Sequence, residues 1–556
     1  MRSGWKAYWG WLLPTAAGLE SSRNLAKWAI LSTAVGLVAG GGAILFYKAM
    51  ELATAAFLGS LVGYFPPMPL GEGAPKVISF ARPWVLPLVT ALGALISGVI
   101  VFSLAPEAEG HGSDAVIEAI HHRGAKIRAR IPLIKLVASA ITIGSGGSGG
   151  REGPTAQISA GFGSVLGQWI GASAKDRRIL VAAGMGAGIG AIFRAPLGGA
   201  ILAAEMLYIH DLEAEVIIPT LIAAIVGYSV FGAYVGFTPI FGDNPTLALN
   251  SPLELVFYAG LGALSGLFGI LYSRCYYKTA AWFHRRSWPR WLKPALGGFM
   301  VGLMGLLLPQ VLHTGYGWVQ LAMQKESLLA WPLWLVLAIP FGKVIATSLS
   351  IGSGGSGGIF GPGMVIGGML GALVWRVAYS LTSHVPPQPA PFVIVGMMAL
   401  FGGIAHAPVA VMIMVAEMTG NLSLLAPAMI AVAISTALVG DNTIYRAQLR
   451  DRASSPFYRA QYRFPILSTL RVRDAMAPLT GERSEKNEAI DTNFVRAETT
   501  LDLALEQMGK RETISVPVVD GGRVIGMLSV SDAIGAYRRA RAAQDVEPPR
   551  GEPGSK

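Results

Sequence analysis

The chain carries one glycine-rich string twice. Residues 143–154 read IGSGGSGGREGP and residues 351–362 read IGSGGSGGIFGP, so the two copies differ at two positions only. A second matched pair of segments follows the two strings. Residues 193–206 read FRAPLGGAILAAEM and residues 405–418 read AHAPVAVMIMVAEM. The sequence therefore predicts two homologous halves, at about residues 25–235 and 252–448.

The surroundings of these strings are those of a membrane protein. Apolar residues make up 52% of the chain and charged residues 14%, which is hard to reconcile with a solvated surface. Apolar runs close to the roughly 20 residues that span a bilayer recur at Trp28–Tyr47, Trp84–Leu104, Val216–Tyr234, Leu255–Leu271 and Leu329–Ala346. A duplication interrupted by glycine at matching positions is typical of transporters, so we expect an all-α polytopic membrane protein with two inverted-topology repeats and broken helices.

The glycine strings also indicate the kind of ligand. Glycine loops cannot cross hydrocarbon as exposed coil, so both strings should lie buried and adjacent to each other. Helices are expected to follow them, at Pro154–Ile170 and Pro362–Tyr379. Two helix N-termini pointing at one place favour a small anion. The alternative is a pair of ordinary tight turns between packed helices.

Other classes of protein fit less well. Neither string is followed by the Gly-Lys-Ser/Thr of a phosphate-binding loop, so a membrane-bound nucleotide-using enzyme is only a remote alternative and we expect no enzymatic activity. A cation transporter would require intramembrane carboxylates or unwound carbonyl sites. The lone Cys275 excludes an intramolecular disulfide framework and a thiolate metal cluster, and no metal site is predicted.

At these residues the chain resembles the CLC family of chloride channels and proton-coupled chloride antiporters, over roughly residues 25–450. Gly150–Pro154 match the family's GREGP motif, Gly358–Pro362 match its GxFxP motif, and Tyr445 in TIYRAQL falls at its pore tyrosine. The resemblance implies transport of chloride or another small anion, a homodimer with one pore in each subunit, and no required cofactor.

The resemblance also implies the site residues. Glu152 is the family's gate, a carboxylate at a helix N-terminus that competes with the permeating anion; the alternative is a plain helix-capping glutamate. In antiporters of the family it is also the outer proton carrier. The predicted anion-binding residues are His111, Gly112, Ser113, Arg151, Gly153, Ile359, Phe360, Gly361 and Tyr445.

One departure from the family pattern concerns the anion. The family's GSGIP is replaced by the GHGSD of residues 110–114, which puts His111 where a serine hydroxyl normally faces the anion. A neutral imidazole N–H can donate to an anion, and a protonated imidazole would bind it more strongly, giving acid dependence between about pH 5 and 8. In the alternative His111 turns aside, Ser113 or backbone N–H groups bind the anion, and Asp114 caps the next helix.

A second departure concerns proton coupling. Many antiporters of the family carry an inner glutamate directly after the one equivalent to Glu205, and here that position is Met206, which cannot carry a proton. Glu205 and Met206 are thus the candidate positions of an inner proton path, and Met206 favours a passive channel over the antiporter. Glu205 and Glu417, equivalent in the two halves, are expected to be structural ion-pair or capping groups.

The ends of the chain have a different character. Residues 451–493 are expected to be a linker, residues 494–540 resemble a CBS motif, and residues 541–556 are expected to be disordered. Ser529 and Asp532 are possible ligands of an adenine nucleotide, or simply start the last helix. Because CBS motifs work in pairs, a single copy favours a homodimer.

The basic residues predict the orientation. The net charge is +11, and lysine and arginine gather in short loops, which marks those loops as cytoplasmic and does not require nucleic acid. Residues 1–24 contain no cleavage site of a signal peptide and are expected to be cytoplasmic. We therefore expect a multi-pass protein of the inner (plasma) membrane, in contact with lipid, with both termini in the cytoplasm.

Overall fold

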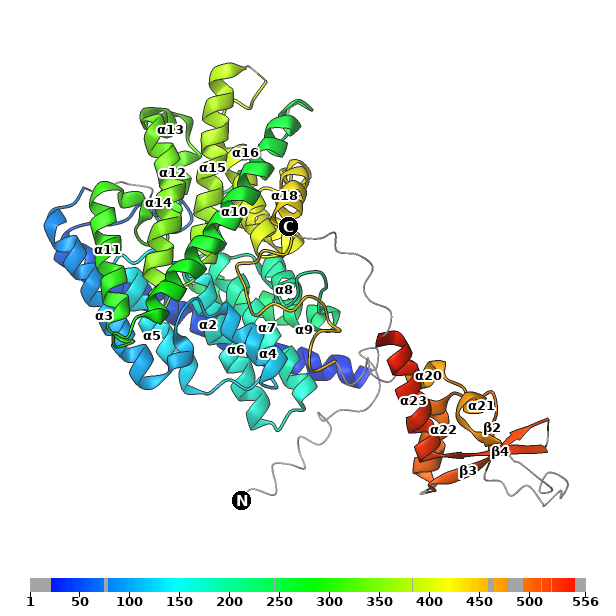
Figure 1. Cartoon of the computed structure of the whole chain (residues 1–556). Coiled ribbons are helices and arrows are strands. Elements are labelled where there is room, and N and C mark those ends of the chain that lie inside the picture. The colour runs from blue at the N-terminus through cyan, green and yellow to red at the C-terminus, as the bar shows by residue number, and fades with distance from the viewer. Residues whose placement is uncertain are drawn as a thin grey trace. The chain divides into compact units, whose positions relative to one another are not determined.

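The computed structural model of the chain describes residues 22–74, 79–244, 247–249, 251–382, 384–458, 465–478, 494–511, 513–521 and 523–545. The chain divides into two compact units, Met1–Arg452 and Ala453–Lys556. Among the described residues, the first unit consists of helices and the loops between them, and the second combines helices with one sheet (Figure 1).

Six helices of the first unit are long and apolar enough to cross a membrane. They are α2 (Ser22–Thr54) continued by the π-helix η2 (Ala55–Val62), η3 (Pro83–Val85) with α3 (Leu86–Leu104), η5 (Ala214–Val216) with α9 (Ile217–Val235), α10 (Glu254–Arg285), α14 (Leu333–Gly352) and α15 (Phe360–Leu381). These cover the apolar runs expected from the sequence, except that the run Leu329–Ala346 begins before α14 and is interrupted at Trp331 and Pro332. Their exposed faces carry many large apolar side chains, including Leu52, Leu88, Val256 and Trp334, which suits contact with lipid.

Shorter or less apolar helices complete this unit. They are α4 (Ser113–His122), α5 (Arg130–Gly144), α6 (Glu152–Trp169), α7 (Ala174–Phe193), α8 (Pro196–Glu205), α11 (Lys293–Leu307), α12 (Tyr316–Ala322), α13 (Lys325–Ala330), α16 (Ala390–Ile404), α17 (Pro408–Thr419) and α18 (Leu425–Val439). Single 3₁₀ turns lie at η4 (Pro106–Ala108) and η6 (Pro309–Val311). Many of these helices end inside the protein, so the spans are broken, as the sequence predicts.

The two halves repeat the same arrangement. Each glycine string is preceded by one helix, α5 or α14, and followed by another, α6 or α15. The buried Lys135 of α5 donates to the carbonyl oxygens of Ala108 and Gly110, at 3.0 and 2.7 Å. Its counterpart Lys343 donates to two carbonyl oxygens of the second half in the same way, at 3.0 and 2.8 Å. The duplication is therefore present in the structure as well as in the sequence.

The helices after the glycine strings begin earlier than the proline positions suggest. α6 starts at Glu152 and α15 at Phe360, so Pro154 and Pro362 both lie inside the first turn. The N–H groups of a first turn have no partner within the helix, so proline is tolerated there. As a result, Glu152 and Phe360 are the first helical residues of their repeats.

The second unit is a small α/β fold. Its four-stranded sheet has the order β1-β4-β3-β2. The strands are β1 (Ala477–Pro478), β2 (Val495–Arg496), β3 (Ser515–Asp520) and β4 (Arg523–Ser529), and the helices are α20 (Pro465–Thr469), α21 (Val472–Ala475), α22 (Leu501–Lys510) and α23 (Val530–Asp545). β3 and β4 form an antiparallel hairpin, while β2 is parallel to β3 with α22 as the connection.

Two expected boundaries of this unit are wrong. Within the expected linker 451–493, α20, α21 and β1 belong to the folded unit: Leu467 and Val472 lie in its apolar core, and Ala477 pairs with Met527 of β4. α23 continues to Asp545, into the tail that was expected to be disordered. Partners distant in sequence stabilise α20, α21 and β1, which their local composition does not indicate. Residues 1–21, 479–493 and 546–556 lie outside the described residues.

Candidate functional site

The two glycine strings pair directly in the middle of the membrane unit. The N–H of Gly150 donates to the carbonyl oxygen of Gly358 at 2.8 Å, and the N–H of Gly358 donates to that of Gly150 at 2.7 Å. The pairing is antiparallel, as two inverted repeats require. Two hydrogen bonds between hydroxyl groups join the two halves on either side of this pairing: Ser139 with Ser356 and Ser148 with Thr347, both at 2.9 Å. The polar groups of the strings thus find partners inside the protein.

Glycine is required in these strings for two reasons. Gly146 and Gly354 have φ values of +104° and +105°, a region that residues with a Cβ rarely adopt. A Cβ on Gly358 would come within 2.8 Å of the carbonyl oxygen of Gly150. The repeated glycines therefore permit both the turn and the close approach of the two strings.

Glu152 of the first repeat is bound by a helix of the second repeat. Its side chain is buried, and its Oε1 accepts the N–H of Gly361, in the first turn of α15, at 2.5 Å. Its Oε2 has no hydrogen-bond partner among the described residues. A carboxylate at this point receives both an N–H group and the positive end of the helix dipole. It occupies the position where an anion would be stabilised.

Most of the other predicted ligands lie nearby. Gly112, with a φ of +87°, precedes α4, whose first residue is the buried Ser113. The buried Tyr445 lies close to the start of α4, because its ring centroid is 5.6 Å from that of His111. A Cβ on Gly153 would come within 2.1 Å of the carbonyl oxygen of His111, so the first turn of α6 directly contacts the start of α4.

Aromatic side chains connect this region to α15. The rings of Tyr445 and Phe401 lie 6.3 Å apart between centroids, and those of Phe401 and Phe360 lie 4.0 Å apart. The carbonyl oxygen of Ile359, the residue before α15, accepts the hydroxyl of Tyr272 at 2.9 Å, which fixes the start of this helix. The structure therefore brings the predicted ligands from α4, α6, α15 and the segment of Tyr445 together.

His111 lies at the border between this region and a cavity of about 540 Å³. Its side chain is only 5% exposed, and its ring centroid lies 5.6 Å from that of Tyr445. Its Nε2 lies 3.3 Å from Oδ2 of Asp114, whereas Nδ1 has no partner among the described residues. Tyr276, Tyr277 and Arg446 line the same cavity.

The alternative in which Asp114 caps α4 is wrong. The residue before the helix is Gly112, and no side chain caps it. Asp114 instead accepts the N–H of Ala447 at 3.1 Å and the hydroxyl of Tyr277 at 3.2 Å. The carboxylate thereby joins α4 to α10 and to the segment that carries Tyr445.

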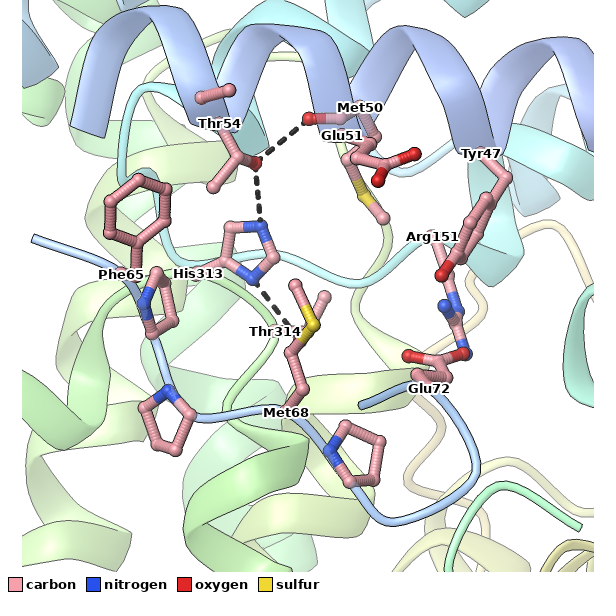
Figure 2. Close-up of a pocket in the computed structure, with 14 residues that line it drawn as sticks. Tyr47, Met50, Glu51, Thr54, Phe65, Met68, Glu72, Arg151, His313 and Thr314 are labelled. Atoms are coloured by element: carbon pink, nitrogen blue, oxygen red, sulfur yellow. Dashed lines mark hydrogen bonds and ion pairs between the residues drawn. The ribbon is translucent and has the colours of Figure 1, made fainter. Parts of the chain in front are cut away.

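Arg151 is placed apart from the other predicted ligands. Its side chain lines a second cavity, of about 200 Å³, where its guanidinium lies 2.5 Å from the carboxylate of Glu72 (Figure 2). The guanidinium also lies 6.0 Å from the ring of Tyr47 and 5.5 Å from the ring of Tyr316. Its positive charge is therefore already matched by a carboxylate.

Glu205 and Glu417 are hydrogen-bonded in the same way in both halves. Glu205 accepts two N–H groups at the start of α17, with Ala410 at 2.7 Å, and Glu417 accepts two at the start of α8, with Gly198 at 2.8 Å. Each carboxylate thus caps a helix of the other repeat. Met206 is buried, and its carbonyl oxygen accepts the side-chain amide of Gln448 at 3.1 Å.

In the second unit, Ser529 and Asp532 bond to each other. The hydroxyl of Ser529 accepts the N–H of Asp532 at 3.2 Å, and Oδ2 of Asp532 accepts the N–H of Ser529 at 3.0 Å. This reciprocal pair is a capping box at the start of α23.

The sequence did not point to three functional neighbours. Asp114 was considered only as a helix cap, although its position three residues after His111 places both on one face. The sequence does not indicate that Glu72 and Tyr316 lie beside Arg151, because only the tertiary structure brings these residues together.

A duplicated helical membrane unit, in which a helix N-terminus of one repeat binds a carboxylate of the other, defines a class of protein that transports anions. The family model described as "Voltage gated chloride channel" matches residues 93–440, and a CBS domain model matches residues 490–539. The chain therefore belongs to the voltage-gated chloride channel (CLC) family. It is a multi-pass membrane protein of chloride transport, not an enzyme.

Curated relatives agree with this assignment. "H(+)/Cl(-) exchange transporter ClcA" of Vibrio cholerae is 30% identical over 432 residues, which cover 75% of this chain and 87% of the relative. "Putative chloride channel protein ClcB-like" of Ralstonia nicotianae is 30% identical over 378 residues, covering 66% and 86%. The relatives thus include proteins named as exchangers and as channels.

Solved structures show the same fold. A slow cyanobacterial Cl⁻/H⁺ antiporter has a TM-score of 0.65 at 23% identity, covering 75% of this chain and 96% of its own. A CLC-type fluoride/proton antiporter has a TM-score of 0.64 at 20% identity, covering 77% and 99%. At these identities the likeness supports the fold alone.

Proposed function

We propose that this protein is a proton-coupled chloride antiporter whose gate is Glu152. The observation that carries the proposal is the hydrogen bond from the N–H of Gly361 to Glu152, which holds the carboxylate at the N-terminus of α15. A deprotonated carboxylate excludes chloride from this place, and a protonated one can leave it to chloride. Proton and chloride then alternate at a single point, which is the elementary event of antiport.

We expect chloride to be bound at this point by groups from both repeats. They are the backbone N–H groups of Gly153, Ile359, Phe360 and Gly361, the side chains of His111, Ser113 and Tyr445, and the backbone at Gly112. Arg151 pairs with Glu72 in a separate cavity, so we expect its side chain not to contact the ion directly. Relatives named as exchange transporters, at 30% identity, support the antiporter over the channel that Met206 first favoured.

A passive chloride channel is the second candidate, because Met206 offers no proton carrier where many antiporters of the family have a glutamate. The two candidates differ in whether protons move with chloride.

We further propose that the protein is a homodimer with one pore per subunit, and that it lies in the plasma membrane with both termini in the cytoplasm. We also propose that Ser529 and Asp532 of the CBS unit bind an adenine nucleotide.

Flux from chloride-loaded proteoliposomes tests the proposal, with chloride efflux and external pH recorded together. The intact protein should take up protons as chloride leaves, and Glu152→Gln should retain chloride efflux without proton uptake. Glu118→Gln, a half-exposed carboxylate on α4, is the matched control and should behave as the intact protein. Chloride efflux with no proton movement in the intact protein would establish the channel, and no chloride flux would overturn both.

A further inference from the structure

We propose that His111 and Asp114 form a proton-binding site next to the anion, which serves as the inner proton site of the transport pathway. This inference rests on the proposed antiport. It assigns a titratable group to a pathway in which position 206 provides none.

The geometry first fixes the tautomer of His111. Its Nε2 lies 3.3 Å from Oδ2 of Asp114, and a carboxylate accepts hydrogen bonds, so Nε2 carries a hydrogen. In the neutral imidazole, Nδ1 then carries no hydrogen and presents a lone pair. Nδ1 is buried and has no partner among the described residues, although buried polar atoms are nearly always satisfied. Residue His111 is among those that line the cavity of about 540 Å³, so water and ions in that cavity are the nearest partners outside the protein.

The two protonation states of His111 act oppositely on chloride. The lone pair of neutral Nδ1 repels an anion. In the imidazolium, Nδ1–H donates a charge-assisted hydrogen bond to the anion, while Asp114 balances the charge at Nε2. Chloride and a proton therefore bind cooperatively, and each raises the affinity for the other by the same factor.

Other charged and titratable groups near His111 have partners of their own. Nζ of Lys135 on α5 donates to the carbonyl oxygens of Ala108 and Gly110. Glu109 lies 3.5 Å from His284, and the guanidinium of Arg446 lies 3.7 Å from the centre of the Tyr277 ring. In the described part of the chain, the rings of Tyr276 on α10 and of Tyr445 lie 6.0 and 5.6 Å from that of His111, and Glu152 begins α6, whose first turn contacts residue 111. Among the described residues, Asp114 is the carboxylate within ion-pair distance of His111.

The proton has a short route through this site. Water in the cavity delivers it to Nδ1, which converts the neutral imidazole to imidazolium. The carboxylate of Glu152 can accept this proton through water in the anion path, after which the protonated carboxyl leaves α15 to chloride and His111 returns to its neutral form. The contact between Gly153 and the carbonyl oxygen of His111 places the two groups at adjoining ends of α6 and α4.

Chloride binding to the purified full-length protein, measured by calorimetry in a Glu152→Gln background, tests the site without interference from the gate. Charge-assisted hydrogen bonds contribute about 1.5–3 kcal/mol. Chloride affinity should therefore rise at least about tenfold between about pH 8 and pH 5. Buffers of different ionisation enthalpy should report proton uptake upon binding.

Three variants decide the outcome. His111→Ser restores a hydroxyl donor and should bind chloride with an affinity that does not change with pH. Asp114→Asn, the second variant should the first fail to fold, should move the pH dependence to lower pH. His210→Ser removes an exposed histidine paired with Asp441 at 3.1 Å and should change nothing. An equal pH dependence with and without His111 would overturn the inference.

Flux measurements separate this inference from the proposed function. With Glu152 intact, His111→Ser should retain chloride efflux and lose most proton uptake. If the intact protein moves no protons, the proposed antiport fails, whereas calorimetry still decides whether His111 binds a proton with chloride. If His111→Ser couples protons normally, the antiport stands and the inner site lies elsewhere.

Discussion

Removal of the Glu72 carboxylate should destabilise the membrane unit and convert the cavity around Arg151 into an anion site. The guanidinium of Arg151 is 1% exposed and the Glu72 side chain 10% exposed, so water replaces little of the lost interaction. Glu72→Ala leaves a buried positive charge without its partner, which costs about 3–5 kcal/mol of unfolding free energy.

A subtler change separates charge from shape. Glu72→Gln keeps an oxygen that can accept the hydrogen bond from Arg151 but removes the negative charge. Hydrogen bonds to charged groups contribute about 1.5–3 kcal/mol and neutral ones about 0.5–1.5 kcal/mol. The expected loss is therefore at least about 1–1.5 kcal/mol, and it stays below that of Glu72→Ala because the guanidinium keeps a hydrogen-bond acceptor.

Chloride should restore part of the stability lost in Glu72→Ala. The cavity of about 200 Å³ beside the guanidinium has room for an anion. A ligand that binds only the folded state stabilises it by about 2.7 kcal/mol at about one hundred times its dissociation constant. The assay is thermal unfolding in detergent, with chloride replaced by a large organic anion at constant ionic strength.

Glu51→Gln is the matched control. Glu51 lines the same cavity but pairs with Lys48 at the surface, with a side chain that is 52% exposed, so its loss should cost no more than about 1 kcal/mol. The reasoning would be refuted if Glu72→Ala were as stable as the intact protein, or if chloride stabilised both equally.

Three further changes have defined outcomes. Lys343→Met leaves two buried carbonyl oxygens without their donor and should lower the unfolding free energy by about 2 kcal/mol or more, measured by denaturation in detergent. Gly358→Ala puts a Cβ within 2.6 Å of Oε1 of Glu152 and 2.8 Å of the carbonyl oxygen of Gly150. Such overpacking costs about 1–3 kcal/mol and should reduce chloride turnover at least about fivefold in liposomes. Asp532→Ala breaks the capping box with Ser529 and should destabilise α23 by about 0.5–2 kcal/mol, seen as faster amide exchange in that helix.

The sequence by itself determined the class of fold and the type of site. Apolar runs and glycine strings impose the same requirement, that every backbone polar group be satisfied inside the protein. The repeat of one string in two halves then indicated that the strings meet, and the Gly150 to Gly358 pairing confirms it. Glu152 could be singled out because a carboxylate two residues before a proline of the first helical turn lies at the helix N-terminus.

The tertiary structure alone decided which side chains complete the site. Local sequence does not show that Asp114 accepts hydrogen bonds from Ala447 and Tyr277 rather than capping its own helix, because those donors are distant in the chain. Nor does it show that Glu72 neutralises Arg151. Hydrophobic periodicity and helix signals follow from neighbours along the chain, whereas the partner of a buried charge is selected by packing in three dimensions.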